Sequence, residues 1–396
     1  MLGADERSVP LRSITQDNWS YAAARCGEAR LSILVETEQR PEGMREDEPV
    51  RLVLAGCGAV TKLYYAEALS RLQSRGQIAV AGIFDPDAKQ AALLQARLPS
   101  AKVAGSFDGL LAMHADIAII ASPTAYHADQ STQALKAGVN VLCEKPLAAS
   151  SSEADRILAA AAANDLHVAT GLVRRQFPAT RSIKAMLEGG LIGRLRSVSC
   201  FEGGPFQWPV ASTTYFSCAE SGGGVLQDIG THCLDLLTWW FGEPDEIHYA
   251  DDAMGGVEAN CLVRLRFGGF EATVRLSRDW ARPNLYRLEG ERGSISWTVN
   301  ETEIVNVALN GSRTTGVVSF TNADGPSRDF VDAFCDQISG LVDAVRNGAP
   351  LSVPASAGRN VLDLVEGCYA RRKLMDMPWL GPEELLNVAA RAGTKQ

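Results

Sequence analysis

The stretch Arg51-Leu52-Val53-Leu54-Ala55-Gly56-Cys57-Gly58-Ala59-Val60-Thr61 carries the fold prediction for this chain. Its first five residues are typical of a buried strand, and a helix is predicted from the glycine turn to about Ser74. In this context Gly56 permits a tight turn, and Gly58 lets a pyrophosphate approach the backbone at the helix N-terminus. Thr61 stands where the pattern usually has Gly or Ala. The turn therefore predicts dinucleotide binding by Gly56, Gly58, Ala59 and Val60.

A second predicted strand, residues 78–84, ends at Asp85. A carboxylate at this place can accept hydrogen bonds from both adenosine ribose hydroxyls and repels a 2′-phosphate, so NAD is preferred and NADP is the alternative. Asp85 also opens an Asp-Pro-Asp sequence, which is a common helix start, so helix capping is the competing interpretation. Because the glycine turn and the acid occur together, we favour cofactor binding.

The order of predicted elements indicates two domains. In residues 50–173 apolar strands alternate with helices, which is typical of an α/β, doubly wound Rossmann domain with its crevice at the carboxyl ends of parallel strands. In residues 174–380 several consecutive strands predict an α+β substrate-binding domain with a large, mostly antiparallel open sheet. Its C-terminal helices can pack back on the first domain. Residues 1–49 are predicted to be a partly disordered extension with one candidate strand at 31–35, and residues 381–396 a tail.

The composition argues against several classes of protein. The chain has 396 residues, 46% of them hydrophobic, and its 38 basic and 47 acidic side chains give a net charge of −9. This acidic balance is unsuited to nucleic-acid binding. No apolar run is long enough to span a membrane, and no export signal is visible. The nine cysteines are widely spaced without a Cys-x-x-Cys pair, so we expect a reducing cytoplasm and neither a disulfide framework nor a metal site.

Glu144-Lys145-Pro146 directly follows a predicted strand, residues 139–143. In a doubly wound sheet this places Lys145 at the mouth of the crevice, and Pro146 restricts it to an extended conformation. An ammonium group beside a reacting carbonyl or alkoxide can stabilise negative charge or act as an acid. The competing interpretation is an ordinary solvated lysine after a strand.

A helix predicted over residues 225–241 carries three ionisable groups on an otherwise apolar surface. Asp228, His232 and Asp235 stand at i, i+4 and i+7 and so share one face. Such a stripe must be paired or must line a wet cavity, because burying it alone would cost several kcal/mol. Two convergent ligands are too few to predict a metal site. A histidine between two aspartates, after the triple glycine at 222–224, favours a functional site over a core histidine.

Together these motifs resemble the glucose–fructose oxidoreductase/inositol dehydrogenase (Gfo/Idh/MocA) family. The resemblance spans residues 50–378 and rests on Gly56-x-Gly58, Asp85, Ala121-Ser122-Pro123-Thr124 with His127, Glu144-Lys145-Pro146, Arg174-Arg175-Gln176-Phe177-Pro178 and Asp228-x-Gly230-x-His232-x-x-Asp235. It implies cofactor contacts from Ser122, Pro123, Thr124, His127, Glu144 and Lys145. It implies substrate contacts from Arg175, Asp228 and His232, to which we add Trp208, because an aromatic side chain can stack on a sugar ring; a packed lid is the alternative for Trp208.

The resemblance implies an NAD(P)-dependent dehydrogenase or reductase. Hydride would pass between nicotinamide and a secondary alcohol or ketone of a sugar, nucleotide sugar or (amino)cyclitol, in a homodimer or homotetramer formed through the C-terminal sheet. His232, oriented by Asp228, or Lys145 would accept the hydroxyl proton. Two other functions stay open: an NAD-dependent glycosidase that uses transient oxidation, and a non-catalytic dinucleotide-binding sensor. The sequence names neither the substrate nor the reaction direction.

Overall fold

The computed structural model describes residues 48–209, 221–253, 256–311, 315–319 and 328–376, together with Glu383, Leu386 and Ala390. These residues belong to one compact unit, Arg45–Gln396. The predicted strand at 31–35 lies outside the described residues, and so does most of the predicted tail.

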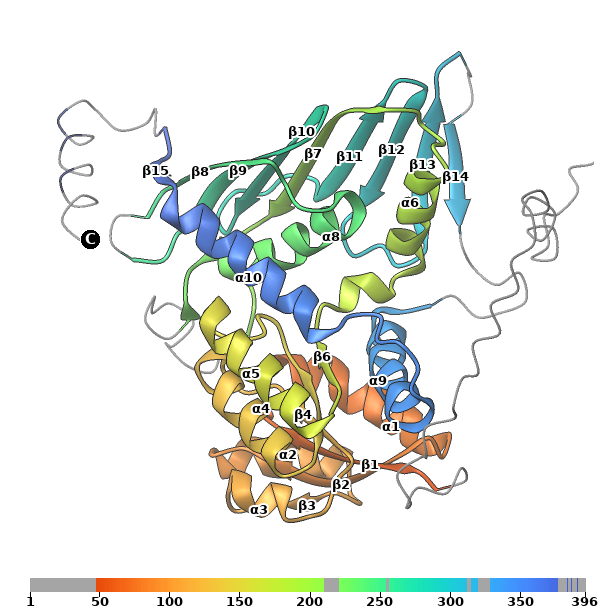
Figure 1. Ribbon diagram of the computed structural model, residues 1–396, viewed down its shortest axis with the longest axis vertical. Coiled ribbons are helices and arrows are strands. Elements are labelled where there is room, and N and C mark those ends of the chain that lie inside the picture. Colours follow the sequence, from red (N-terminus) through yellow and green to blue (C-terminus); the bar gives the residue numbers. More distant parts are fainter. Residues whose placement is uncertain are drawn as a thin grey trace, which may run out of the picture. The chain divides into compact units, whose positions relative to one another are not determined.

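The first sheet is a doubly wound parallel sheet, as the sequence predicts (Figure 1). Its six strands run in the order β3-β2-β1-β4-β5-β6, and every neighbouring pair is parallel. The strands are β1 (Val50–Ala55), β2 (Ile78–Phe84), β3 (Lys102–Val103), β4 (Ile117–Ile120), β5 (Asn140–Cys143) and β6 (Val168–Thr170). Strands β4, β5 and β6 are buried at every residue, because helices cover both faces of the sheet. The strand order reverses between β1 and β4, which is where ligands bind in such sheets.

The first sheet is covered by helices, some of which begin at a capping side chain. They are η2 (Thr61–Tyr65), α1 (Ala66–Ser74), α2 (Ala88–Arg97), α3 (Phe107–Leu111), η3 (Thr124–Tyr126), α4 (His127–Lys136) and α5 (Ser151–Asn164). Asp87 and Ser150 each accept a hydrogen bond from a backbone N–H in the first turn of α2 and α5. Figure 1 shows α4 and α5 side by side, and the two helices are in contact.

The second sheet has nine described strands in the order β14-β13-β12-β11-β7-β10-β9-β8-β15. They are β7 (Leu195–Gly203), β8 (Glu246–Asp251), β9 (Asn260–Phe267), β10 (Phe270–Ser277), β11 (Leu285–Gly290), β12 (Gly293–Thr298), β13 (Ile304–Leu309), β14 (Thr315–Ser319) and β15 (Arg372–Leu374). Only the pairs β7–β10 and β8–β15 are parallel among these strands. The predicted α+β domain with a mostly antiparallel sheet is therefore confirmed.

Helices lie on one face of this sheet (Figure 1). They are α6 (Pro178–Glu188), the turn η6 (Leu226–Gly230) with α8 (Thr231–Phe241), and α10 (Ala355–Ala370), while η4 (Val173–Gln176) connects the two sheets. Along β9 the residues Cys261, Val263 and Leu265 are fully buried, whereas Arg264 and Arg266 between them are exposed. The sheet therefore has a helix-covered face and an open face.

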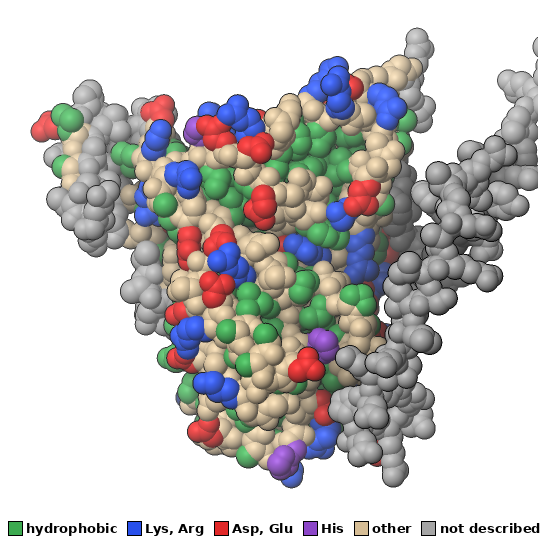
Figure 2. Space-filling view, viewed as in Figure 1, with side chains coloured by type: hydrophobic (Ala, Val, Ile, Leu, Met, Phe, Trp, Pro, Cys, Tyr) green, Lys and Arg blue, Asp and Glu red, His purple; other side chains and the backbone are tan. Residues whose placement is uncertain are grey.

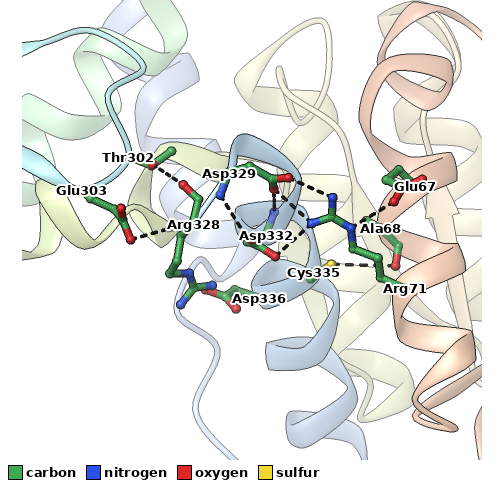
Figure 3. Close-up of polar contacts among 10 residues, drawn as sticks. All are labelled: Glu67, Ala68, Arg71, Thr302, Glu303, Arg328, Asp329, Asp332, Cys335 and Asp336. Carbon is green, nitrogen blue, oxygen red and sulfur yellow. Dashed lines mark hydrogen bonds and ion pairs between the residues drawn. The ribbon is translucent and has the colours of Figure 1, made fainter. Parts of the chain in front are cut away.

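The last two described helices, α9 (Phe330–Asn347) and α10, contact the first domain. Figure 3 shows Arg71 of α1 reaching Asp329 and Asp332 at the start of α9, at 2.9 and 3.1 Å. Asp329 also caps α9 through a reciprocal hydrogen-bond pair with Asp332. On the other side Arg359 of α10 pairs with Asp155 of α5 at 2.9 Å. These contacts bring the carboxyl ends of the first sheet and the helices of the second against one cavity.

Acidic and basic side chains are interspersed over the face drawn in Figure 2. In the part of the chain that the structure describes, no helix is long and apolar enough to cross a membrane.

Candidate active site

A cavity of about 800 Å³ lies between the two domains, at the carboxyl ends of β1, β4 and β5. It is where a doubly wound sheet is expected to bind its ligand. The predicted site residues that line it are Gly58, Ala59, Val60, Ser122, Pro123, Thr124, His127, Glu144, Lys145, Trp208, Asp228 and His232. Gly56, Asp85 and Arg175 are not among its lining residues.

The two glycines of the first turn have different tasks. Gly56 has a φ of +99°, and a Cβ there would lie 2.3 Å from the backbone carbonyl of Ala121, so only glycine allows β1 to turn against the end of β4. A Cβ at Gly58 would meet nothing within 4 Å, and Gly58 lines the cavity, so this position leaves the space that a pyrophosphate needs. Thr61 is buried and its hydroxyl donates to the carbonyl of Gly56 at 2.7 Å, which explains why threonine suits the third position.

Asp85 is held against this turn. Its Oδ2 accepts a hydrogen bond from the backbone N–H of Cys57 at 2.7 Å, and its Oδ1 accepts one from Asp87 at 2.9 Å. The N-cap of α2 is Asp87, so the competing interpretation of Asp85 as the helix cap is wrong.

His127 connects two loops at the cavity wall. It is 1% exposed, and its Nδ1 and Nε2 each lie 2.8 Å from a carbonyl oxygen, those of Pro146 and Ser122 respectively. Burial lowers the pKa of His127. The side chain therefore braces the Ser122 loop against the Glu-Lys-Pro segment.

Glu144 supports its neighbour Lys145 from inside the protein. The buried carboxylate accepts hydrogen bonds from the hydroxyl of Tyr65 at 2.7 Å and from the backbone N–H of Lys145 at 3.1 Å. Burial raises the pKa of Glu144. A Cβ at Gly171 would lie 2.9 Å from this carboxylate, so a glycine just after β6 lets the chain pass closely beside Glu144.

Lys145 joins the first domain to the helix that carries Asp228 and His232, which we call the acid–histidine helix. Its Nζ donates to Oδ1 of Asp228 at 2.6 Å and to the backbone carbonyl of Asp228 at 3.1 Å. The other carboxylate oxygen accepts from Nη2 of Arg278 at 3.0 Å. Asp228 is therefore shared by two cations, and its role in orienting His232 stays a prediction.

The helix that carries these groups is not a continuous α-helix. Its first turn, η6, is π-helical, and α8 begins only at Thr231. A π turn contains more than 3.6 residues, so Asp228 and His232 are not related by the α-helical spacing that the sequence predicts. Asp228 and His232 line the cavity, whereas Asp235 is buried elsewhere. His232 Nδ1 is buried without a hydrogen-bond partner among the described residues.

Asp235 has a structural partner, and this corrects the expectation for Arg175. Nη2 of Arg175 lies 2.7 Å from Oδ1 of Asp235, its Nε contacts both carboxylate oxygens, and its guanidinium lies 5.3 Å from the ring centre of Trp239. Arg175 is thus paired with Asp235 and does not line the cavity, so nothing in this geometry supports its predicted substrate contact. Arg174 lines the cavity instead, in a bidentate pair with Glu202 at 2.7 and 2.8 Å. Adjacent side chains on the short 3₁₀ turn η4 diverge, and the Arg-Arg pair by itself did not reveal which one faces the site.

Arg278 is a cavity residue that the sequence analysis missed. It follows the end of β10, and its guanidinium lies 4.8 Å from the ring centre of Phe206. No motif marks it, because an arginine after a strand is usually solvent-exposed. The strand β10 contacts the η6 turn, and Arg278 at its end lies beside Asp228.

The environment of His232 predicts a pH effect on stability. Burial, together with the charges of Lys145 and Arg174, holds the pKa of His232 well below 6.5. The unfolded chain therefore takes up a proton from about pH 6.5 downward that the folded chain refuses, so stability falls below that pH. We expect the urea midpoint to drop more between pH 7.5 and 5.5 in the wild type than in His232→Gln. Equal drops in the two proteins would contradict the assigned environment.

Comparisons with known proteins agree with this geometry. Residues 50–172 match the model of the oxidoreductase family with an NAD-binding Rossmann fold, and residues 180–296 match the GFO/IDH/MocA C-terminal domain. The rhizopine catabolism protein MocA of Rhizobium meliloti is 27% identical over 332 residues, which are 80% of this chain and 93% of MocA. The scyllo-inositol 2-dehydrogenase (NADP(+)) IolU of Bacillus subtilis is 28% identical over 202 residues, 50% of this chain and 62% of IolU.

Solved structures share the fold. Levoglucosan dehydrogenase in complex with NADH and levoglucosan has a TM-score of 0.72 at 19% identity, over 82% of this chain and 97% of that one. An inositol dehydrogenase homologue from Azotobacter vinelandii in complex with NAD⁺ has a TM-score of 0.73 at 20% identity, over 82% and 95%. The two family models together match more than half of the chain. The first model describes an NAD-binding fold, and the open space at Gly58 fits that cofactor. The chain therefore belongs to the Gfo/Idh/MocA family of oxidoreductases with an NAD-binding Rossmann fold.

Proposed function

We propose that this oxidoreductase acts on a secondary alcohol or ketone of a polyhydroxylated ring, such as a sugar, nucleotide sugar or (amino)cyclitol. The observation that carries the proposal is Lys145, whose ammonium group is held 2.6 Å from Asp228 in the cavity that His232 also lines. This set can bind a hydroxyl group and exchange its proton. The name of IolU, an inositol dehydrogenase, supports a ring of this kind.

The residues of the cavity have different roles in the proposed reaction. When bound, NAD supplies the hydride acceptor or donor at its nicotinamide ring. Gly58 leaves room for the pyrophosphate, and Ser122, Pro123, Thr124 and Glu144 line the same cavity. Lys145 Nζ stabilises negative charge on the substrate oxygen. His232 lines the same cavity and is the alternative acceptor of the hydroxyl proton, beside Lys145.

A substrate panel tests this function. Purified enzyme is incubated with NAD and a series of sugars, nucleotide sugars, cyclitols and aminocyclitols, and the NADH absorbance is followed. Net NADH formation with a panel member supports the dehydrogenase, whereas aglycone release without net NADH identifies a glycosidase. If neither appears, and no ketone of the series is reduced with NADH, the proposal fails and the sensor is favoured.

We further propose that Asp85 selects NAD over NADP. Its carboxylate, fixed beside Cys57, would repel a 2′-phosphate, and like charges in contact cost several kcal/mol. In Asp85→Asn we expect the ratio of kcat/KM for NAD over that for NADP to fall by about tenfold or more, which corresponds to at least 1.4 kcal/mol. Asp87→Asn, at the exposed cap of α2, is the matched control and should keep the wild-type ratio. An unchanged ratio in Asp85→Asn would remove Asp85 from cofactor selection.

We also propose a cytoplasmic homodimer or homotetramer that assembles through the open face of the second sheet. This face carries Trp280, which is 47% exposed, with the guanidinium groups of Arg275 and Arg282 at 5.6 and 5.1 Å from its ring centre. The seven cysteines in the described ranges are buried free thiols, which suits a reducing compartment. Light scattering of the wild type and of Trp280→Glu tests the interface, and a monomeric wild type would refute it.

A further inference from the structure

The last two residues of the triple glycine before the acid–histidine helix are packed against two residues from elsewhere in the chain, Glu258 and Tyr369. A Cβ at Gly224 would lie 2.0 Å from the carbonyl oxygen of Glu258 and 2.6 Å from its backbone nitrogen. A Cβ at Gly223 would lie 2.0 Å from the hydroxyl oxygen of Tyr369. The two glycines are therefore needed because Glu258 and Tyr369 approach this turn closely.

Glu258 holds the turn with both its side chain and its backbone. The residue is 1% exposed, and its Oε1 accepts hydrogen bonds from the N–H groups of Gly224 and Leu226, each at 3.0 Å, and from the hydroxyl of Tyr369 at 2.8 Å. Its carbonyl oxygen accepts from the N–H of Val225 at 3.0 Å. Backbone N–H groups at the start of a helix have no partner within the helix, so Glu258 caps this helix from a neighbouring loop.

This cap is one helical turn away from the catalytic groups. The carbonyl of Gly224 accepts a hydrogen bond from the N–H of Asp228 at 3.1 Å. The carbonyl and the carboxylate of Asp228 in turn both accept from Nζ of Lys145. The position of residues 224–226 therefore sets the position of both acceptors that hold Lys145.

The chemistry of the contact requires a carboxylate. Oε2 of Glu258 lies 3.6 Å from Nη2 of Arg372 in β15, and no described residue donates a hydrogen bond to it. Arg372 also pairs with Asp251 at 2.6 Å. In Glu258→Gln the amide oxygen could keep the hydrogen bonds that Oε1 now accepts, but the NH₂ group would then face the guanidinium of Arg372. A guanidinium has no acceptor atom, so this NH₂ group would have no partner there.

We propose that Glu258 is a positioning residue for the reaction. Through residues 224–226 it holds Asp228, and through Asp228 it holds the Nζ of Lys145 at the substrate; Tyr369 is the second support of the same turn. The kinetic part of this inference rests on the proposed dehydrogenase function. The structural part does not depend on any substrate.

The kinetic test compares Glu258→Gln with Asp251→Asn. Both variants remove one of the two buried acids that face Arg372, but only Glu258 contacts residues 224–226. In Glu258→Gln we expect kcat to fall between about 10- and 100-fold, the range caused by displacing a reacting group by up to 1 Å, with unchanged NAD affinity. Asp251→Asn should keep the wild-type kcat in its folded fraction. Equal kcat values in the two variants would overturn the proposal.

A second test needs no substrate and uses a milder change. Tyr369→Phe removes one hydrogen bond to Oε1 and leaves the buried charge in place. We expect faster amide hydrogen exchange over residues 224–228 in this variant than in the wild type or in Asp251→Asn, at equal melting temperature. Unchanged exchange would overturn the positioning role. Because this result is read without substrate, it separates a failure of the positioning role from a failure of the proposed function.

Discussion

Replacing Lys145 by alanine should lower kcat by about 10² to 10⁴-fold, the usual contribution of a positioned proton-transfer group. The variant loses the ammonium group that donates to Asp228 at 2.6 Å and lines the cavity at the end of β5. Arg278 still neutralises Asp228 at 3.0 Å, so the cavity is not left with an unpaired acid. The affinity for NAD should therefore stay close to the wild-type value. The two quantities are measured by NADH absorbance under saturating substrate and by fluorescence titration with NAD.

The control for this variant is Lys136→Ala on the exposed end of α4, which removes a lysine of the same domain outside the cavity. It should show wild-type kcat and NAD affinity. A Lys145→Ala enzyme with near-normal turnover would refute the role of Lys145. A parallel loss of NAD affinity would instead make Lys145 chiefly a cofactor-binding residue.

Substitutions at the two glycines of the first turn should have different effects: the variant at Gly56 should lose stability, and the variant at Gly58 should lose affinity for NAD. In Gly56→Ala the new Cβ would lie 2.3 Å from the Ala121 carbonyl, at a φ of +99° that alanine rarely adopts. Backbone strain and overpacking together should lower the free energy of unfolding by about 3 kcal/mol. The urea midpoint at pH 7.5 measures this loss.

Gly58→Val should behave in the opposite way. A Cβ at this position meets nothing within 4 Å, so the free energy of unfolding should stay near the wild-type value. The side chain fills the space left for the pyrophosphate, and the Kd for NAD should rise by about tenfold or more, at least 1.4 kcal/mol. If Gly58→Val binds NAD normally, the cofactor does not approach the backbone at this turn. If the free energy of unfolding falls as far in Gly58→Val as in Gly56→Ala, a side chain at position 58 does not have the open space described above.

Local chemistry was sufficient to predict much of the first domain. The turn at Gly56 and Gly58 follows a strand and precedes a helix in the chain itself, and Lys145 directly follows β5. The carboxyl ends of parallel strands meet at one edge, so motifs after successive strands converge without further information. Most of the residues predicted for the cofactor therefore line one cavity.

The second domain shows where this reasoning stops. The spacing of Asp228, His232 and Asp235 was interpreted as one stripe, but Asp235 does not line the cavity and pairs with Arg175, a partner from another segment that the spacing does not reveal. No local pattern marks β15 as a strand, because its pairing with β8 joins segments that lie far apart in the sequence. Arg278 and Glu258 carry no motif at all.

The sequence by itself thus determined the two fold types, the cofactor turn and the presence of Lys145, Asp228 and His232 at a site, because each depends on neighbours in the chain. Only the tertiary structure decided that Asp228 is shared between Lys145 and Arg278, that Arg174 rather than Arg175 lines the cavity, and that Glu258 caps the helix that carries Asp228 and His232. The physical reason is that an ion pair or a cap between distant segments depends on how sheets and helices pack. The spacing of residues along one segment does not determine that packing.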